Sequence, residues 1–355
     1  MKNHLHLAIA RAEFEQQIRN FFKKRDFVEV QTPIMVKTPG MEPHLNVFET
    51  KFYDKNCPRR TPAATGGGKS AEGGPRYLNH SPELQMKKLL GHKNPFDKTD
   101  HFEKIFQITK VFRNGEIGGP LHSPEFTMLE WYRKNADYKT LMTDCENLIT
   151  TLQTTLNFKS EFSMQPAART LQQSPWPRIS TQELFQKHTG TSLLKNRTYK
   201  QLKKAAKKLD LPIKSCKTWD DIFFTIFLNK IEPNLPKTPI FITDYPASQA
   251  ALARLKSNEP FFAERFELYI NGIELCNAFS ELTDPKEQRK RLIKEQRQRK
   301  KMGKTVFPID EDFLKALKNL HTSKTTAAGC AFGLDRLLMV LINKQNIEDV
   351  LFFPL

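Results

Sequence analysis

The segment 105–133, which reads IFQITKVFRNGEIGGPLHSPEFTMLEWYR, constrains the fold of this chain more than any other stretch. Two arms rich in apolar and aromatic residues flank a polar loop with glycine and proline, which is the pattern of two strands joined in a hairpin. Alternation along the first arm places Arg113 at the end of its more polar face, opposite Phe106 and Ile108. The positively charged side chain of Arg113 is therefore expected at the point where the first strand ends and the loop begins.

The second arm of this hairpin carries its functional groups on one face. Residues two apart in a strand point the same way, so Phe126, Met128, Glu130 and Tyr132 project together. An aromatic ring, a carboxylate and a phenol on one sheet face predict a site for a charged, planar ligand. The same pattern fits an amphipathic hairpin with a solvated face, and the pattern alone leaves both interpretations open.

Length and composition set outer limits. With 355 residues the chain can form one large domain or two smaller ones. No run approaches the roughly 18 apolar residues of a membrane span, and the first residues lack a secretory signal, so a cytoplasmic protein without membrane association is expected. The five cysteines are at least 54 positions apart, which excludes a CxxC pair and predicts reduced thiols.

The chain is strongly basic. Lys and Arg number 56 against 39 Asp and Glu, which gives a net charge of +17. Such a charge attracts polyanions. Nucleic acid and an acidic protein satisfy it equally well, so charge alone does not choose the partner.

Local patterns predict a mixture of helices and strands. Residues 54–76 are rich in Gly and Pro and predict a flexible loop; its GGGKS does not complete a phosphate-binding loop, because Ala63 occupies the place of the first glycine. Asn271-Gly272 marks a tight hairpin turn, and the middle region 158–262 reads as mainly helical. Helices are predicted at 5–24, 82–91, 137–156, 181–188, 198–209, 218–231, 285–302 and 334–342, and a strand within 237–246.

Three charged residues near the C-terminal side invite a chemical interpretation. Glu274 and Glu281 are seven apart, so strict alternation would put them on opposite faces of a strand. For both to meet one ligand, the strand must break near Ala278. Arg336 falls in the first turn of a helix, where free backbone amides and a cation can together hold a phosphate.

In order along the chain, these motifs resemble the catalytic domain of class II aminoacyl-tRNA synthetases, in the lysine branch. DFVEVQTPIM with the first helix is similar to motif 1, FRNGEIGGPLHSPEF to motif 2 and GCAFGLDRLLM to motif 3, with SPELQMKKLL and GIELCNAFSEL between them. The resemblance spans most of the chain. It implies an α+β class II synthetase catalytic fold, a mixed but mostly antiparallel sheet flanked by helices, over a single domain 1–355.

Lysyl-tRNA synthetases carry an N-terminal anticodon-binding domain, and here motif 1 begins almost at Met1, so that domain is expected to be absent. The nearer resemblance is to the stand-alone ligases of this branch, which attach (R)-β-lysine to a lysine of elongation factor P. Ser81 and Ala331 favour these ligases, since the synthetases usually have alanine and glycine there. Ser280 and the C-terminal DVLFFPL are more similar to the synthetases.

The resemblance implies roles for individual residues. Arg113 would contact the α-phosphate and the substrate carboxylate, Arg336 the γ-phosphate, and Phe126 would stack on adenine; Glu274 and Glu281 would hold Mg²⁺. The remaining ATP-binding residues it implies are Asn114, Gly115, Glu116, Ser123, Leu275 and Gly333. The residues it implies around a lysine-type substrate are Ser81, Pro82, Glu83, Glu130, Tyr132, Asn277, Glu281 and Ala331.

Motif 2 is where the chain departs most from the family. The family usually has Glu directly after Arg-Asn, whereas here Gly115 follows and Glu116 comes one position later. Ser123 stands where asparagine is usual. Either Glu116 makes the adenine contact expected of the motif 2 loop, or the loop makes none.

The sequence leads to one main hypothesis and two alternatives. The main hypothesis is a homodimeric ligase that uses ATP and Mg²⁺ to activate lysine or (R)-β-lysine as an adenylate and transfers it to elongation factor P. The first alternative is a minimal lysyl-tRNA synthetase that charges tRNA. The second is an inactive, synthetase-like binding protein, which the retained Arg113, Glu274, Glu281 and Arg336 argue against.

Overall fold

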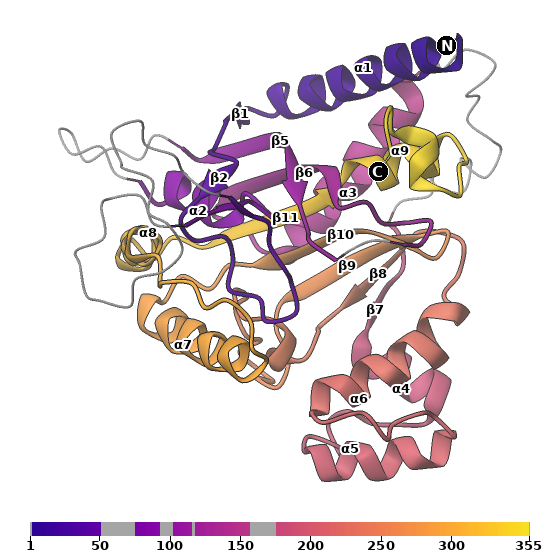
Figure 1. Ribbon diagram of the computed structural model, residues 1–355, viewed down its shortest axis with the longest axis vertical. Helices are drawn as coiled ribbons and strands as arrows, with labels where there is room; N and C mark the ends of the chain where they lie inside the picture. Colours follow the sequence, from indigo (N-terminus) through magenta and orange to yellow (C-terminus); the bar gives the residue numbers. More distant parts are fainter. Residues whose placement is uncertain (1, 51–74, 93–101, 116–117, 157–174, 355) are drawn as a thin grey trace, which may run out of the picture.

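A computed structural model describes residues 2–50, 75–92, 102–115, 118–156 and 175–354 (Figure 1). Its centre is an eight-stranded sheet with the strand order β1-β5-β6-β11-β10-β9-β8-β7. Only the two outermost pairs, β1 with β5 and β7 with β8, are parallel. The predicted mixed, mostly antiparallel sheet is confirmed. In chain order its strands are Val28–Glu29 (β1), Lys104–Phe112 (β5), Glu125–Lys134 (β6), Arg178–Ser180 (β7), Ile240–Thr243 (β8), Arg265–Ile270 (β9), Ile273–Ser280 (β10) and Ala327–Gly333 (β11).

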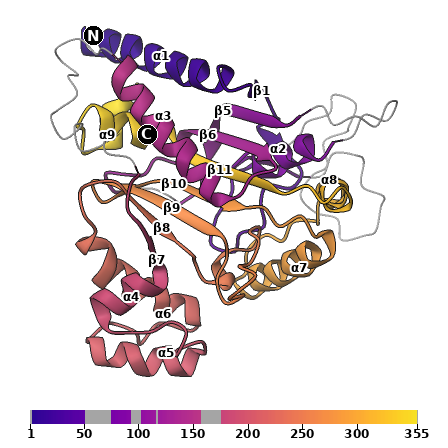
Figure 2. The same cartoon turned by 180° about the vertical axis from the view of Figure 1, so that it is seen from behind.

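Helices α1 (Lys2–Lys23), α3 (Tyr138–Thr155) and α9 (Leu334–Leu341) pack on one face of this sheet (Figures 1 and 2). Phe22 of α1 stacks on Phe106 of β5, with ring centroids 4.8 Å apart, and also contacts Trp131 of β6. The predicted faces of the hairpin are thus confirmed, since Phe106 and Ile108 point into this core. Large apolar side chains make it the main core of the molecule.

Helix α2 (Glu83–Leu90) covers the opposite face at β5 and β6. Its Met86 and Leu90 pack with Ile105 and Tyr132, which are register partners across the hairpin. Helices α7 (Pro285–Lys301) and α8 (Glu311–Thr322) continue this layer, and α2 packs on α8. A small three-stranded sheet, β2-β4-β3, lies outside the main one, with strands Met35–Val36, Glu49–Thr50 and Arg76–Leu78 for β2, β3 and β4.

The second predicted hairpin is also confirmed, with one change. Asn271 and Gly272 both have positive φ, 58° and 75°, as a tight two-residue turn between β9 and β10 requires. The strand is irregular, but its register shifts between Glu274 and Cys276, not near Ala278. The predicted position of the break was wrong, because a bulge at Leu275 already supplies the extra residue.

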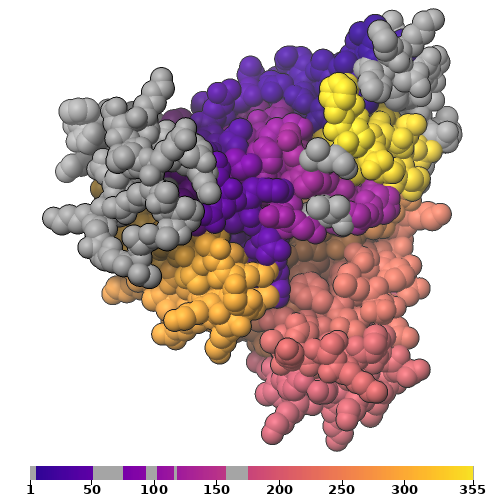
Figure 3. Space-filling view, in the orientation of Figure 1, coloured from indigo at the N-terminus to yellow at the C-terminus, as the bar shows by residue number. Residues whose placement is uncertain are grey.

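The described part of the middle region forms a helical lobe that projects from the end of the sheet (Figures 1 and 3). The lobe is built from α4 (Thr181–Thr189), α5 (Tyr199–Ala206) and α6 (Trp219–Ile226). A capping box of Ser180 and Glu183 opens α4, and α5 and α6 begin with boxes of the same kind. Their apolar faces form a second core with β8 and β9.

Some sequence expectations lie outside the described residues. The flexible loop at 54–76 is almost wholly outside them, as are Glu116 and residues 157–174. Among the described residues, no helix is both long enough and apolar enough to span a membrane.

Candidate active site

A recess of about 350 Å³ opens on the α2 side of the sheet. Its walls come from β6, β10, β11 and the beginnings of α2 and α9, so motifs far apart in the sequence meet there. Glu42 and His80 are among the wall residues that were not expected from the sequence. The expected site residues that line the recess are Ser81, Glu83, Arg113, Ser123, Phe126, Tyr132, Glu274, Leu275, Asn277, Ala331, Gly333 and Arg336.

Glu130 lies fully buried behind the wall formed by Tyr132. The Ser81 hydroxyl donates to one carboxylate oxygen of Glu130 at 2.6 Å, and the Tyr132 hydroxyl donates to the other at 2.7 Å. The Ser81 oxygen also accepts from the backbone amide of Glu83, just after Pro82, which caps α2. Ser81 therefore connects the start of α2 to the carboxylate on the hairpin.

Lys87 joins two further carboxylates that the sequence placed around the substrate. Its ammonium group contacts both Glu83 and Glu281 and lies 4.9 Å from the ring centroid of Phe279. All three charged side chains are largely buried. The sequence analysis missed Lys87, although its position four residues after Glu83 on a predicted helix puts both on one face.

Burial raises the pKa of these carboxyl groups. The pKa of Glu130 rises to about 8 because it is buried and because Glu83 lies nearby. That of Glu281 also rises to about 8, since burial and Glu83 outweigh the attraction of Lys87. Burial alone would lower the pKa of Lys87, but Glu281 and Glu83 raise it. The recess therefore presents acidic groups that hold protons until a cation arrives.

The other end of the recess is cationic. The Arg113 guanidinium lies 5.1 Å from the ring centroid of Phe126, so the expected phosphate-binding and adenine-stacking residues are neighbours. Arg336 donates from Nε to the carbonyl of Leu121 at 3.1 Å and from a terminal nitrogen to the carbonyl of Glu274 at 3.0 Å. These bonds hold Arg336 toward the hairpin loop.

The two carboxylates expected to share Mg²⁺ have different neighbours. Glu274 lies 3.8 Å from Arg336, and its pKa is raised to about 7 by burial and by Glu267 of β9. Glu281 instead contacts Lys87. Glu267 is itself bonded by Arg265 and by the hydroxyl groups of Tyr245 and Tyr269, and the assignment of Mg²⁺ to Glu274 and Glu281 stays a prediction.

The hairpin loop holds the residues that depart from the family. Asn114 forms a β-bridge with Asn46, and Gly115 has a φ of 91°, a value that favours glycine. Ser123 is buried and lines the recess. The extra Gly115 is thus accommodated by a left-handed turn beside Arg113.

Strand β11 closes the site between β6 and β10. Gly329 is opposite Tyr132, and a Cβ at Gly329 would collide with the Tyr132 ring and lie 2.7 Å from Glu281. Ala331 is the register partner of both Asn277 and Glu130. Small residues in this strand therefore make room for the acidic group and the phenol.

A buried network places α9 against the hairpin. Arg11 of α1 lies 2.6 Å from Asp335, and Asp335 accepts from the backbone amide of Thr127 at 2.6 Å. Arg11 also donates to the Thr127 hydroxyl at 2.7 Å. Since Arg336 is the next residue, this network fixes its direction.

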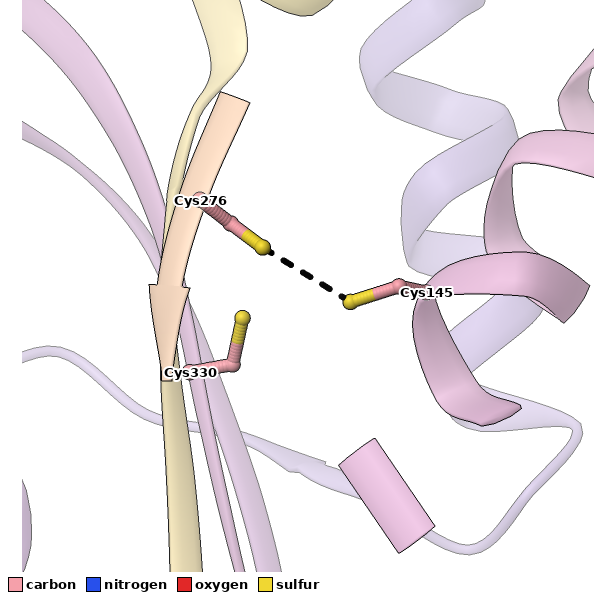
Figure 4. A group of neighbouring side chains, drawn as sticks. All are labelled: Cys145, Cys276 and Cys330. Atoms are coloured by element: carbon pink, nitrogen blue, oxygen red, sulfur yellow. Dashed lines mark hydrogen bonds between the residues drawn. The ribbon is translucent and has the colours of Figure 1, made fainter. Parts of the chain in front are cut away.

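Three of the cysteines meet on the other side of the sheet. Cys145 of α3, Cys276 of β10 and Cys330 of β11 point their sulfur atoms toward one another, all within 4.8 Å (Figure 4). All three are buried in the main core, where burial raises the pKa of Cys145 and Cys330. They are free thiols, as predicted, and pack as small apolar groups.

Comparison of the sequence with known proteins shows the family of the chain. The sequence pattern of the family "tRNA synthetases class II (D, K and N)" matches residues 2–355. The elongation factor P–(R)-beta-lysine ligase of Proteus mirabilis is 36% identical over 349 residues, covering 98% of this chain and 94% of that protein. The ligase of the same name from Hamiltonella defensa is 35% identical over 349 residues, with the same coverage. The lysine–tRNA ligase of Carboxydothermus hydrogenoformans is 33% identical over 353 residues, covering 98% of this chain and 64% of that protein.

Proposed function

Because the chain belongs to the class II tRNA synthetases (D, K and N), we propose that it is an ATP-dependent aminoacyl ligase that transfers (R)-β-lysine to a lysine side chain of elongation factor P. The amino acid is first activated as an adenylate, with release of pyrophosphate. An amino group of the protein substrate then attacks the adenylate carbonyl, and AMP leaves.

The observation that carries this proposal is the cluster of Glu83, Glu130 and Glu281 beside the recess. A lysine-type amino acid has two ammonium groups, and buried carboxylates that hold protons are suited to exchange those protons for such a cation. Lys87 offsets one carboxylate. When all four groups are ionised, the three glutamates and Lys87 together carry two negative charges. These balance the two positive charges of the substrate's ammonium groups.

The cationic end of the recess supports adenylate formation. Negative charge develops on the α-phosphate as the substrate carboxylate attacks, and Arg113 lies where it can stabilise that charge. Phe126 offers a face for adenine, and Arg336 a cation for the terminal phosphate. Glu274 and Glu281 would hold Mg²⁺, which would add positive charge against the phosphate oxygens.

Transfer to elongation factor P is favoured over transfer to tRNA by the relatives of the chain. The elongation factor P ligases of Proteus mirabilis and Hamiltonella defensa are 36% and 35% identical to it, and the lysine–tRNA ligase of Carboxydothermus hydrogenoformans is 33% identical. Ala331 adds a methyl group to the wall beside Asn277 and Glu130, which suits an amino acid whose amino group lies one carbon further along. Activation of L-lysine and charging of tRNA is the alternative function.

We also propose that the protein is a homodimer that associates through α1 and β1. Leu5 and Ile9, four residues apart on α1, are 62% and 55% exposed, and Val28 of β1 is 48% exposed. Leu5 and Ile9 lie together near the start of α1, whereas β1 lies near its other end (Figure 1). Neighbouring exposed apolar side chains are typical of a surface that another protein covers.

The deciding experiment is ATP–pyrophosphate exchange with L-lysine and with (R)-β-lysine, followed by transfer to elongation factor P or to tRNA. We expect faster exchange with (R)-β-lysine and labelling of elongation factor P alone. Charging of tRNA alone would overturn the proposal in favour of the synthetase. Exchange with neither amino acid would overturn both enzymatic functions.

A further inference from the structure

The helical lobe contains one strongly basic stretch of the chain. Residues 187–217 contain ten Lys and Arg against one Asp, so these 31 residues contribute +9 of the net +17. Nine of the ten basic side chains are exposed, and Lys203 is half-buried. The lobe lies beyond β7 and β8 (Figures 1 and 2), and none of its lysines lines the recess.

Five of these lysines form what we call the lysine face: Lys195, Lys200, Lys204, Lys207 and Lys208. On α5 and the turn that follows it, a spacing of four, three and one places the last four on one side, opposite the buried Leu202 and Ala206. Like charges four apart on a helix repel each other. Folding of the lobe does not explain this arrangement, because its core is apolar.

The lysine face is not neutralised within the molecule. Among the ten basic residues, the described part of the chain offers an ion pair only to Arg197, with Glu259 at 2.9 Å. Lys203 donates to the hydroxyl of Tyr199 at 2.6 Å. The five lysines of the lysine face have neither kind of partner among the described residues.

A groove of about 430 Å³ runs along the lysine face. Lys195, Lys204 and Lys208 line it. The rest of its lining includes the small polar residues Thr189, Thr191, Ser192, Asn196 and Gln201. Ammonium groups beside hydroxyl and amide groups are suited to phosphate oxygens.

We propose that the lysine face docks the sugar–phosphate backbone of a folded RNA, independently of the ligase reaction. Protein–protein interfaces are enriched in Tyr, Trp and Arg and depleted in Lys, whereas lysines contact phosphates without reading sequence. The groove along the lysine face is lined by no aromatic side chain and no Arg. Its composition therefore favours a nucleic acid backbone over an acidic protein, and binding is expected to be independent of base sequence.

The test measures fluorescence anisotropy of a labelled 16-base-pair RNA duplex at several salt concentrations. The variant replaces Lys200, Lys204, Lys207 and Lys208 by Gln. The matched control replaces four lysines that are exposed elsewhere, Lys23, Lys24, Lys139 and Lys318, and so removes the same charge. Thermal unfolding and ATP–pyrophosphate exchange, both expected to be unchanged, verify that each variant is folded and active.

We expect the lysine-face variant to bind the duplex at least tenfold more weakly at low salt, with the control within about twofold of the unaltered protein. The slope of log affinity against log salt should also fall by about one for each phosphate that the variant no longer neutralises. If both variants bound the RNA duplex equally weakly, the loss of affinity would come from the change in net charge alone. That result would overturn the proposal. Competition by poly-L-glutamate as strong as by RNA would also overturn it, in favour of an acidic protein partner.

Discussion

Lys87 sets how many carboxylates beside the recess can be ionised together. It contacts Glu83 and Glu281, and all three groups are largely buried. An ammonium group with two acidic partners is held firmly, which its raised pKa reflects. The Lys87 ammonium group is of the same chemical type as the ammonium groups of a lysine-type substrate. Glu83 and Glu281 therefore already bind a cation before the substrate enters.

Substitution Lys87→Met should cost about 3–5 kcal/mol of the free energy of unfolding at pH 8, because it leaves buried carboxylates without their cation. The loss should shrink as pH falls toward 5, since a carboxyl group with a raised pKa takes up a proton. Denaturant unfolding at several pH values measures both effects. Lys88→Met, which removes a half-buried pair with Asp310, is the control and should cost less than about 1 kcal/mol. A pH-independent loss for Lys87→Met would contradict this account.

Binding of the amino acid should release protons at pH 7. Glu130 and Glu281 have pKa values raised to about 8, so both are mostly protonated there, and a bound ammonium group favours their ionised forms. Affinity for lysine or (R)-β-lysine should therefore rise about tenfold between pH 6.5 and pH 8. Titration calorimetry in two buffers with different ionisation enthalpies measures the protons released. Heats that do not depend on the buffer would refute this prediction.

Substitution Ala331→Gly should shift preference toward L-lysine, because it removes the methyl group beside Asn277 and Glu130. We expect the ratio of kcat/KM for (R)-β-lysine to that for L-lysine to fall about tenfold, the effect of one methyl group in a packed pocket. Exchange assays with both amino acids measure the ratio. Ala328→Gly, on the core side of the same strand, is the control; it should lower stability and leave the ratio unchanged. An unaltered ratio for Ala331→Gly would show that this wall does not select the substrate.

At the scale of elements, α1, β6 and α9 are joined by one buried cluster of polar groups. Asp335→Asn should lower the free energy of unfolding by about 3 kcal/mol, since it removes the partner of the largely buried Arg11. It should also raise the KM for ATP, because Arg336 follows directly. Glu15→Gln removes the other, more exposed partner of Arg11 and should cost less than about 1 kcal/mol. If Asp335→Asn changes stability but not the KM for ATP, the network does not position Arg336.

Elements with a strong local signal could be predicted from the sequence. The hairpin of β5 and β6, the Asn271-Gly272 turn and the capped helix α4 all follow from alternation, turn residues and caps. Strand β11 was missed because AAGCAFG is composed of small residues that favour no strand. Its position between β6 and β10 imposes the extended form, and small side chains are what the adjoining phenol and carboxylate leave space for.

The site was predictable only in part, for a related reason. Motif order brought the residues of the recess together, and that prediction needed no geometry. The pairing of Lys87 with Glu281, the proximity of Glu267 to Glu274 and the meeting of three cysteines all join segments far apart in the chain. Neither periodicity nor spacing carries information about such contacts.

On the scale of the whole molecule, the exposed apolar side chains of α1 and β1 predict that two copies of the chain associate. We expect a dimer at micromolar concentration, and Leu5→Lys with Ile9→Lys should yield a folded monomer, because each change places a charge on the proposed interface. Light scattering after size-exclusion chromatography measures the mass. Leu228→Lys, at a side chain 52% exposed on the helical lobe, is the control and should remain dimeric. A doubly substituted protein that stays dimeric would place the interface elsewhere.

The bulge at Leu275 determines which side chains of β10 lie on each face of the sheet. It places Glu274, Asn277 and Phe279 at the recess and Glu281 against Lys87, while Cys276 and Ala278 pack in the core. Deleting Leu275 would remove the bulge and leave Glu274 paired with Tyr269 and Cys276 with Leu268, so the two sets would keep their faces. Deleting one residue between Cys276 and Glu281 would instead reverse the faces on one side of the deletion. When related chains are aligned, a single-residue gap at position 275 is therefore compatible with this chemistry, whereas a gap between positions 276 and 281 marks either an alignment error or a protein that has lost it.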